Sequence, residues 1–446
     1  MTMEIKLRQP LLRIQTDTEL PDHVDVAIIG GGIAGVSAAY FLAKKGLSVV
    51  VLEKGLVGAE QSSRNWGWCR QQGRDLHELA LMKRSIELWH SLQKETGRDL
   101  GFRECGSLFI TSDLSQIERW REWQRTAAGH GIEGKLLDPS EARSRAPGYV
   151  GQSVGGLATP TDGYAEPDRA TPMLAQAARE LGVKIIQNCA VRLLDIEAGR
   201  VTGVITEHGR ILAQAVICAG GAWSGKLLRR HGIKLPQGHV YGSALATQGG
   251  ASELTSCTST PTVSTRVRTD GGLTVGLNGR GTVYLTPTLL RYGTRFVPLY
   301  RIRRKWLKVR IASNFLSEMN EKDWGESDIS PFERSRILDP GPDMELVARA
   351  LHDLIIAYPE MRSAVTKYAW GGVIDSLPDL LPVLSPVDHV PGLFLSTGFS
   401  GHGFGIAPAA GELMSALVTG DRPRVDSTPF RYSRLIDGSK LRPGVM

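Results

Sequence analysis

Three glycines near the start of the chain have the spacing that brings a backbone close to a diphosphate. Gly30, Gly32 and Gly35 form a G-x-G-x-x-G pattern directly after the apolar run 24–29. The first glycine permits a tight turn, the second lets the backbone approach a pyrophosphate, and the third lets a helix pack closely on the strand. The N-terminus of that helix directs N–H groups and a positive dipole end at the phosphates. The pattern predicts a dinucleotide site; the alternative is a glycine-rich packing turn without a ligand.

An acidic residue, Glu53, ends the next apolar run, which covers residues 48–52. At this distance from the glycines, its carboxylate can accept hydrogen bonds from ribose hydroxyls. A carboxylate here disfavours a 2′-phosphate, so it argues against NADP. The two runs and the helical spacing over 33–45, which stops at Gly46, predict a compact βαβ unit.

A second glycine cluster occupies residues 398–406, near the other end of the chain, and leads into a helix predicted over 406–417. The first glycine pattern alone does not distinguish NAD from FAD. A flavin ring, however, lies far from the pyrophosphate and needs a contact surface of its own. Backbone N–H groups and a helix N-terminus beside the N1–C2 carbonyl side of the ring would stabilise a reduced flavin anion. We therefore predict FAD held by both ends of the chain; the alternative is a loop-to-helix turn that binds nothing.

The segments between the two clusters predict a mixed fold. Helical spacing covers 75–95, 114–128, 139–145, 167–181 and 343–358, and strand-like runs cover 183–187, 190–197, 200–207, 210–213 and 216–221. This order indicates an α/β protein: a Rossmann-like FAD-binding domain built from discontinuous segments, and a strand-rich α+β substrate-binding domain. We expect the FAD-binding domain in 22–85, 155–230 and 372–435, and the substrate-binding domain in 86–154 and 231–371.

The charge of the chain says little about its partners, but one segment of the chain is strongly basic. The 446 residues carry a net charge of +7, and most of that charge is spread along the chain. We therefore expect no nucleic-acid partner. One dense basic stretch covers 291–310. It is either a solvated face that helps to position anionic substrates, or a surface that contacts anionic lipid or an electron acceptor.

The cysteines and the N-terminal residues bear on the cellular location. Five cysteines, an odd number without a Cys-x-x-Cys pair, argue against a disulfide framework and against a structural zinc site, and we expect no metal. Residues 1–21 lack an apolar signal core, and no window is apolar enough to span a membrane. A cytoplasmic location is expected, with peripheral contact to the inner membrane as an open alternative. The sequence leaves the oligomeric state open.

Four blocks of residues resemble the D-amino-acid-oxidase-like superfamily of FAD-dependent amine oxidoreductases, which includes sarcosine oxidase, glycine oxidase, γ-glutamylputrescine oxidase and hydroxyproline dehydrogenases. The blocks are 25–53, 62–67, 216–224 and 370–410, in the order found in that superfamily. The resemblance implies FAD as cofactor. The contacts that the sequence and the resemblance together imply are Gly30, Gly32, Ile33, Ala34, Gly35, Glu53, Lys54, Ser62, Ser63, Arg64, Asn65, Trp66, Val191, Ala219, Gly220, Trp223, Gly398, Phe399, Gly401, His402, Gly403, Phe404, Gly405 and Ile406.

Within these blocks, a few residues are candidates for the chemistry itself. A substrate carboxylate favours a bidentate arginine, and Arg64 and Arg70 lie in the loop that the resemblance places near the flavin. Each could instead bind phosphate or form an ion pair. Trp66 could line a cation–π pocket for an amine or pack in the core. His402 is the predicted polar group at the ring, or else a turn histidine, and Asp375 could neutralise an amine or cap a turn.

The same loop departs from the sarcosine-oxidase pattern, which has a His-Gly pair where this chain has residues 64–70. The departure argues against sarcosine as substrate. Cys69 is either a covalent attachment point for the flavin or a small buried apolar residue.

We expect FAD-dependent oxidation of the C–N bond of an amino acid or a related amine to an imine. The imine would hydrolyse to a carbonyl product, and the electrons would pass to O2 or another acceptor. Two alternatives remain open: oxidation of the C–OH group of a hydroxy acid, and a non-catalytic FAD-binding assembly factor.

Overall fold

The first glycine pattern lies at the end of the first strand of a largely parallel sheet. The computed structural model describes residues 5–7, 10–250 and 252–444. The first sheet has the strand order β10–β11–β12–β1–β2–β9, and it continues from β12 through β21 to β20. Its strands are β1 (His23–Ile29), β2 (Val49–Glu53), β9 (Lys184–Gln187), β10 (Val191–Glu197), β11 (Arg200–Thr206), β12 (Gly209–Cys218), β20 (Val383–Pro386) and β21 (Leu393–Thr397).

Parallel pairing joins β9, β2, β1, β12 and β21, whereas β10, β11 and β20 pair in antiparallel fashion. Parallel strands are covered on both faces, which explains why β1 and β2 are continuous apolar runs. Alternate residues of β1 reach two different cores. Val26 and Ile28 face helices, while Ala27 and Ile29 belong to the core on the other side of the sheet.

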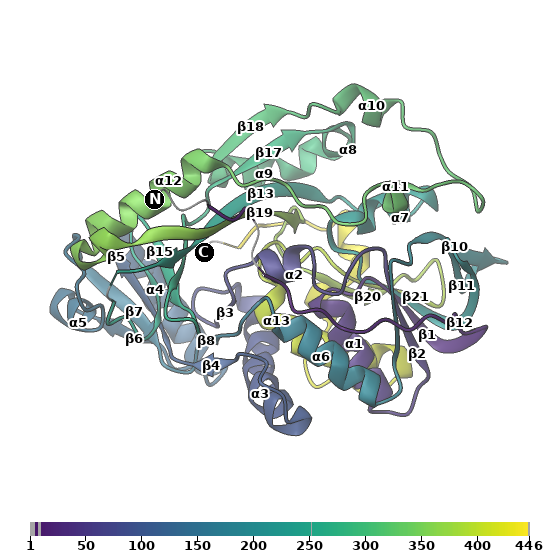
Figure 1. The fold of residues 1–446 in the computed structure, drawn as a ribbon, viewed down its shortest axis with the longest axis horizontal. Coiled ribbons are helices and arrows are strands. Elements are labelled where there is room, and N and C mark those ends of the chain that lie inside the picture. The colour runs from purple at the N-terminus through teal and green to yellow at the C-terminus, as the bar shows by residue number, and fades with distance from the viewer. Residues whose placement is uncertain (1–4, 8–9, 251, 445–446) are drawn as a thin grey trace.

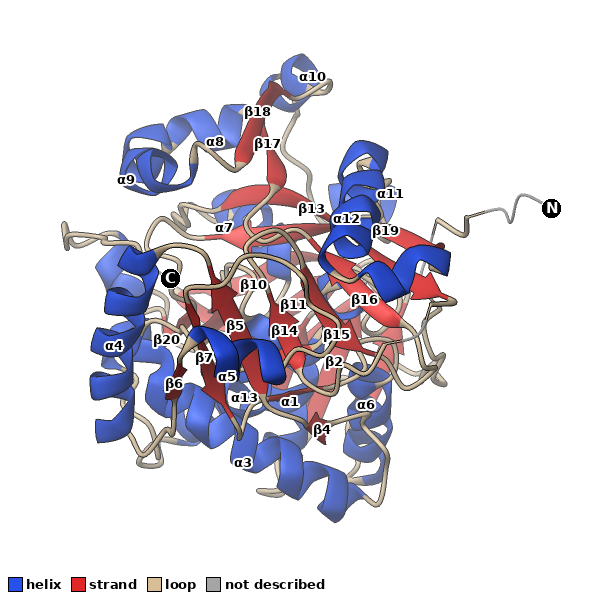
Figure 2. Ribbon diagram, turned by 90° about the vertical axis from the view of Figure 1, so that its left-hand side faces the viewer, coloured by secondary structure: helices blue, strands red, loops and turns tan. Residues whose placement is uncertain are grey.

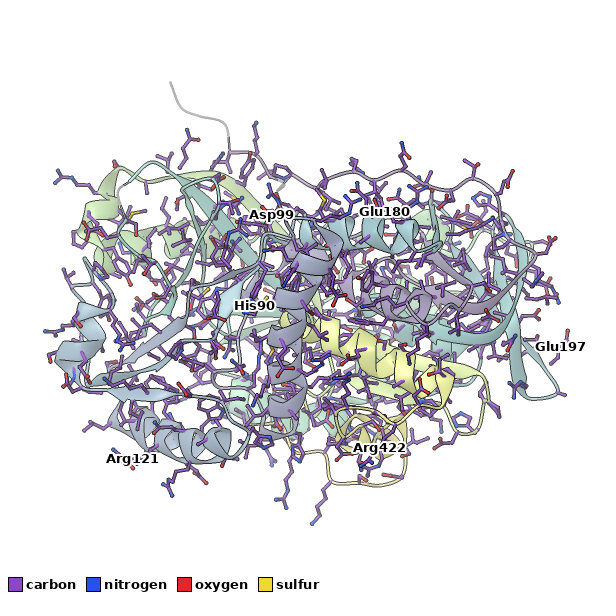
Figure 3. All side chains as sticks on the ribbon, turned by 90° about the horizontal axis from the view of Figure 1, so that it is seen from below. His90, Asp99, Arg121, Glu180, Glu197 and Arg422 are labelled. Atoms are coloured by element: carbon purple, nitrogen blue, oxygen red, sulfur yellow. The ribbon has the colours of Figure 1, made fainter. Side chains whose placement is uncertain are left out.

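Helices α1 (Ile33–Ala43), α6 (Ala170–Glu180) and α13 (Gly403–Thr419) cover one face of the first sheet, and α3 (Leu79–Thr96) packs against α13. Helix α1 from the start of the chain packs against α13 from its end. The two helices approach so closely that a Cβ on Gly411 would lie 2.5 Å from the backbone of Ser37. Seen from below, α3 and α13 lie side by side, with His90 near the middle of the view and Arg121 and Glu197 near its edges (Figure 3).

A second, mostly antiparallel sheet stands beside the first (Figures 1 and 2). Its order is β18–β17–β13–β16–β15–β14–β5–β7–β6, and β19 pairs with β13 along most of their lengths. The strands are β5 (Ser107–Thr111), β6 (Lys135–Leu137), β7 (Gly155–Thr159), β13 (Gly238–Gln248), β14 (Cys257–Ser259), β15 (Ser264–Val267), β16 (Leu273–Gly276), β17 (Gly281–Leu285), β18 (Leu307–Ile311) and β19 (Val365–Ser376).

Helices α4 (Leu114–Gly129), α5 (Pro139–Ser144) and α12 (Met344–Ala357) pack on the second sheet. A small third sheet joins β3 (Trp68–Cys69), β8 (Gly163–Tyr164) and β4 (Arg103–Glu104). Short helices α2 (Gln61–Arg64), α7 (Ser224–Arg230) and α11 (Pro331–Arg334) lie between the large sheets or beside them.

A peripheral module projects at the top of Figures 1 and 2. It consists of α8 (Pro287–Arg291), α9 (Gly293–Arg303), β18 and α10 (Phe315–Met319), and it carries the basic stretch 291–310. Many of its apolar side chains are exposed, including Trp306, Ile311 and Leu316. Across the described ranges, no helix is both long enough and apolar enough to cross a membrane.

The structure confirms the α/β fold class and corrects some predicted boundaries. Helix α6 begins at Ala170, later than the predicted 167, and residues 210–213 and 216–218 belong to one strand, β12. The first part of β12 pairs with β11 and alternates between buried and exposed residues, while its last residues are all buried. Because the burial pattern changes part-way along β12, the sequence predicted two separate strands there. The domain boundaries stay a prediction, although β7, at residues 155–159, pairs with β5 and β6 in the second sheet.

Candidate cofactor and active site

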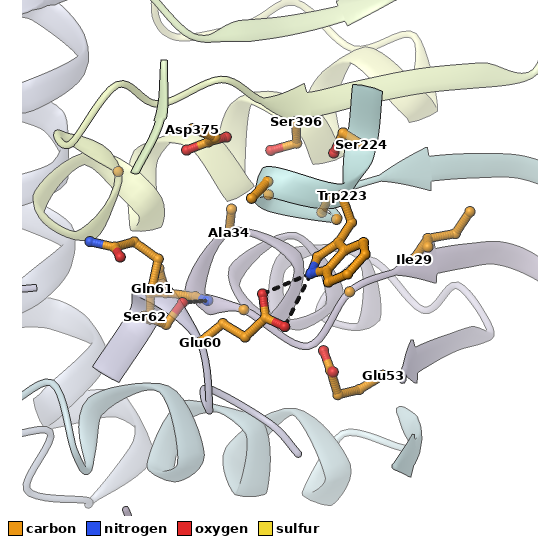
Figure 4. Close-up of a pocket in the computed structure, with 18 of the residues that line it drawn as sticks. Ile29, Ala34, Glu53, Glu60, Gln61, Ser62, Trp223, Ser224, Asp375 and Ser396 are labelled. Atoms are coloured by element: carbon orange, nitrogen blue, oxygen red, sulfur yellow. Dashed lines mark hydrogen bonds between the residues drawn. The ribbon is translucent and has the colours of Figure 1, made fainter. Parts of the chain in front are cut away.

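A cleft with about 1250 Å³ of open space lies where the parallel strands of the first sheet end. Its walls come from the turn between β1 and α1, the loop after β2, the turn after β12 and the start of α13 (Figure 4). In open parallel sheets, ligands bind at the carboxyl ends of the strands. The two glycine clusters, from opposite ends of the sequence, therefore meet at one cavity.

The glycine turn depends on two close backbone contacts. Gly30 has a φ of +110°, and a Cβ there would lie 2.5 Å from the carbonyl oxygen of Ala219. A Cβ on Gly35 would lie 2.1 Å from the carbonyl oxygen of Gly30. A side chain at either position would push apart β1, α1 and the turn after β12. Both glycines thus perform the steric roles expected of the pattern.

Glu53 stabilises the turn through hydrogen bonds and also faces the cleft. Its Oε2 accepts a hydrogen bond from the N–H of Gly31 at 2.7 Å, and its Oε1 accepts one from the N–H of Gly55 at 2.7 Å. Burial raises the pKa of Glu53, and the nearby Lys54 ammonium opposes that shift. A carboxylate oxygen accepts more than one hydrogen bond. Glu53 can therefore hold the turn and still accept from hydroxyls of a ligand.

Two buried polar atoms beside the cleft have no hydrogen-bond partner among the described residues. They are Oε1 of Gln61 and Oγ of Ser396, and both residues line the cleft. Buried polar atoms are nearly always paired, so these two indicate a polar ligand in the cleft. The cleft thus has the shape, the backbone approach and the open hydrogen-bond positions that a dinucleotide requires.

Most of the predicted cofactor residues come together at this cleft. Those on its wall are Gly30, Gly32, Ile33, Ala34, Glu53, Lys54, Ser62, Asn65, Val191, Ala219, Gly220, Trp223, Phe399, Gly401, Gly403 and Phe404. The others do not line the cleft: Gly35, Ser63, Arg64, Trp66, Gly398, His402, Gly405 and Ile406. Their direct contact with a cofactor stays a prediction.

His402 points away from the cleft, toward a buried carboxylate. Its Nδ1 lies 3.2 Å from Oε2 of Glu78, and both side chains are almost fully buried. Burial lowers the pKa of His402, and the positive charge of Arg74 lowers it further. His402 also stands at the N-terminus of α13, where its backbone N–H donates to the carbonyl of Phe399. Its backbone position, more than its ring, shapes this end of the cleft.

The two predicted arginines are engaged in the protein interior. The Arg64 guanidinium lies 2.6 Å from Asp339 and also donates to the carbonyl of Ala59. Arg70 donates to the carbonyl of Gln72 and lies over the ring of Phe109. Burial, followed by repulsion from Arg74, lowers the pKa of Arg70 to about 9.

Of the other two residues of this loop that the sequence singled out, Cys69 is buried and Trp66 is partly buried. Trp66 packs on β16 so tightly that a Cβ on Gly276 would lie 2.2 Å from its ring. Cys69 is buried, and burial raises the pKa of its thiol. Cys69 is thus a core residue, whereas Trp66 is partly buried, and the roles proposed for both stay predictions.

Two residues on the wall of the cleft, Glu60 and Phe332, were not predicted from the sequence, whereas Asp375 was predicted as an amine contact or a turn cap. Glu60 accepts from the indole N–H of Trp223 at 3.1 Å (Figure 4). Phe332 reaches the cleft from a distant part of the chain. Asp375 accepts from the N–H of Gly398 at 2.7 Å, and burial raises its pKa to about 6. Asp375 therefore caps a turn and also faces the cleft.

A second cavity, with about 2280 Å³ of open space, adjoins the cleft and shares Ala222 and Trp223 with it. In the register of β13 and β19, His239 lies opposite Asp375 and Tyr241 lies opposite Val373. Directly opposed residues project from the same face of a sheet. Asp375 and Val373 line the cleft while His239 and Tyr241 line the second cavity, so one sheet face forms the floor of both.

Comparison with known sequences agrees with this geometry. The profile of the family described as FAD dependent oxidoreductase (DAO) matches residues 25–417. The chain belongs to this family. FAD is accordingly its cofactor, as the sequence predicted. The predicted membership in the D-amino-acid-oxidase-like superfamily is confirmed as well.

Several members of the family are similar over almost the whole chain. The structure of L-amino acid deaminase from Proteus myxofaciens, in complex with anthranilate, is 29% identical with a TM-score of 0.92, and the match covers 95% of this chain and 96% of that one. Glycine oxidase from Geobacillus kaustophilus (strain HTA426) is 26% identical over 92% of this chain and 97% of its own length. Mitochondrial sarcosine dehydrogenase of Homo sapiens is 25% identical over 93% of this chain, which spans only 42% of that protein.

Gly35→Ala should weaken FAD binding by about tenfold or more, because the new methyl group would displace the turn that receives the pyrophosphate. The measurement is a fluorescence titration of apoprotein with FAD. Gly129→Ala, at the end of α4, is the matched control, since a Cβ there meets nothing within 4 Å. Unchanged FAD affinity of Gly35→Ala would contradict the role assigned to this contact.

Proposed function

We propose that the protein oxidises the C–N bond of an amino acid or a related amine and passes the electrons to O2 or another acceptor. The observation that carries the proposal is the adjoining pair of cavities on one sheet face, one suited to FAD and one suited to a small substrate. Similarity to the L-amino acid deaminase over nearly the full length of both chains supports an amino acid as the substrate class. Bound FAD supplies the chemistry by accepting a hydride equivalent from the carbon next to nitrogen.

The protein's own groups would hold the cofactor and orient the substrate. The N-terminus of α13, at Gly403, directs its positive dipole end toward the cleft and favours negative charge there. Asp375 is ionised above a pH of about 6, and its carboxylate can accept a hydrogen bond from a substrate ammonium at the junction of the cavities. We assign it the role of holding the amine and taking up its proton.

The second cavity would receive the remainder of the substrate. The rings of Tyr241 and Tyr284 meet edge to face, 4.9 Å apart, on its floor. Arg310 on β18 lies in register with Tyr284 and also lines this cavity. Because Arg64 and Arg70 are engaged in the interior, Arg310 is the better candidate to bind a substrate carboxylate. The participation of Arg64, Arg70, Trp66 and His402 in catalysis stays a prediction.

An anaerobic substrate screen tests the proposed reaction. L- and D-amino acids, N-methyl amino acids and 2-hydroxy acids are each mixed with the holoprotein, and the flavin absorbance is followed. We expect at least one amine to bleach the flavin and to yield ammonia or an alkylamine together with a carbonyl product. Bleaching by hydroxy acids alone would favour C–OH oxidation instead. A flavin that no small molecule reduces would favour the non-catalytic assembly factor.

We further propose that the peripheral module attaches the protein to anionic lipid from the cytoplasmic side. Its exposed apolar side chains are interspersed with basic ones, as in interfacial segments. The exposed apolar residues are Leu290, Val297, Tyr300, Ile302, Trp306, Val309, Ile311, Leu316 and Met319. The basic residues of the stretch are Arg291, Arg295, Arg301, Arg303, Arg304, Lys305, Lys308 and Arg310. The cytoplasmic location stays a prediction.

Cosedimentation with phosphatidylglycerol vesicles tests this attachment. Reversing Arg301, Arg304 and Lys305 to Glu should reduce vesicle binding more than tenfold, since each basic residue near such a surface contributes about 1 kcal/mol. Reversing the exposed Arg121, Arg125 and Arg143 to Glu changes the net charge equally and should leave binding nearly unchanged. Equal loss in both variants, or no binding by the parent protein, would contradict the proposal.

A further inference from the structure

A short segment of the chain, residues 331–340, runs from beside β10 of the first sheet, past the loop that follows Glu53, toward α12 on the second sheet. We call this segment the strap. It begins with α11 and precedes α12. Phe332 in the strap lines the cofactor cleft, and Leu338 and Pro340 line the second cavity. The strap therefore borders both cavities, although its sequence contains no nucleotide-binding pattern.

The strap is seated on the backbone next to Glu53. The ammonium of Lys54 donates to the carbonyl oxygens of Ser335 and Arg336 at 2.8 and 3.0 Å. A Cβ on Gly55 would lie 2.3 Å from the carbonyl oxygen of Arg336, so the two backbones are in direct contact. The strap thus lies against the same loop that presents the carboxylate of Glu53 to the cleft.

Glu60 joins the strap to the wall of the cleft. Its Oε1 accepts from the Lys54 ammonium at 2.6 Å and from the backbone N–H of Leu338 at 2.9 Å. The same carboxylate accepts from the indole N–H of Trp223, as Figure 4 shows, and Lys54 lies 4.4 Å above that indole ring. Hydrogen bonds to a charged group are roughly twice as strong as neutral ones, so this cluster is a firm attachment.

Further ion pairs tie the strap to the side of the first sheet. Glu333 pairs with Arg192 of β10 at 2.6 Å, and Asp339 pairs with Arg64 of α2 at 2.6 Å. Arg336 pairs with Glu207, which directly follows β11. The ring of Phe332 packs edge-on against that of Trp223, 5.9 Å away. Phe332 therefore forms part of an aromatic wall on the side of the cleft bounded by Val191 and Leu52.

We propose that the strap is a clasp that covers the ADP portion of bound FAD and limits the rate at which the cofactor dissociates. Glu60 is the residue that holds the strap in place. The assignment rests on FAD as the cofactor and needs no knowledge of the substrate. The contacts of Glu333, Ser335 and Arg336 lie at the end of the cleft that holds Glu53 and Val191, because their partners Lys54 and Arg192 directly follow those two residues. Loosening the strap should therefore affect the nucleotide portion of the cofactor first.

Glu60→Gln tests the clasp, because it keeps the side-chain size but removes the charge that binds Lys54. We expect FAD to leave the diluted holoprotein about tenfold faster or more, measured from the rise of free-FAD fluorescence. Calorimetric titration of apoprotein with ADP should show a comparable loss of affinity. Glu412→Gln removes a similarly buried ion pair, with Arg84 at 2.7 Å, far from the cleft, and should match the parent protein in both measurements.

Lys54→Met provides a second variant, since it removes the bonds to Ser335, Arg336 and Glu60 but leaves the Glu60–Trp223 contact. It should also accelerate FAD release while the far-ultraviolet circular dichroism stays that of the parent. Release at the parent rate in both variants, or equal acceleration in Glu412→Gln, would overturn the clasp. Neither measurement involves turnover. A result that contradicts the proposed role of the strap is therefore independent of whether the proposed oxidation is correct.

Discussion

The direct backbone contact between two turns of the first sheet is the constraint on which the site depends. Gly30 comes so close to the carbonyl of Ala219 that no side chain fits between them, and Gly35 comes equally close to Gly30. These contacts bring the start of α1, the end of β12 and the loop after β2 to one edge of the sheet. A cleft for a diphosphate forms there because glycines, which carry no side chain, line its base.

The two ends of the chain meet as a consequence of how the helices pack. Helix α13 lies against α1, with Gly411 at the crossing, so its N-terminus is held at the far end of the same cleft. The second sheet then closes the cleft from the side through β19, and its floor continues into the second cavity. Cofactor and substrate would therefore share one continuous surface, and Asp375 lies where the two cavities meet.

The sequence predicted the parts of the site that are built from local structure. The glycine turn, the apolar runs of β1 and β2, Glu53 at the end of β2 and the glycine-rich start of α13 all follow from short-range steric and hydrogen-bonding rules. The contacts of Arg64 and Arg70 did not follow from such rules, because residue type alone does not reveal a partner as distant in the sequence as Asp339. The strap was missed for a similar reason: Phe332 and Leu338 reach the cleft only through tertiary contacts with Trp223 and Glu60.

Hydrogen exchange of the apoprotein titrated with FAD is the most direct test of the claim that one cofactor joins both ends of the chain. The account predicts that peptides covering 30–35, 219–224 and 399–404 gain protection together, with one shared dissociation constant. Protection confined to the first glycine turn, or protection by NAD in place of FAD, would contradict it.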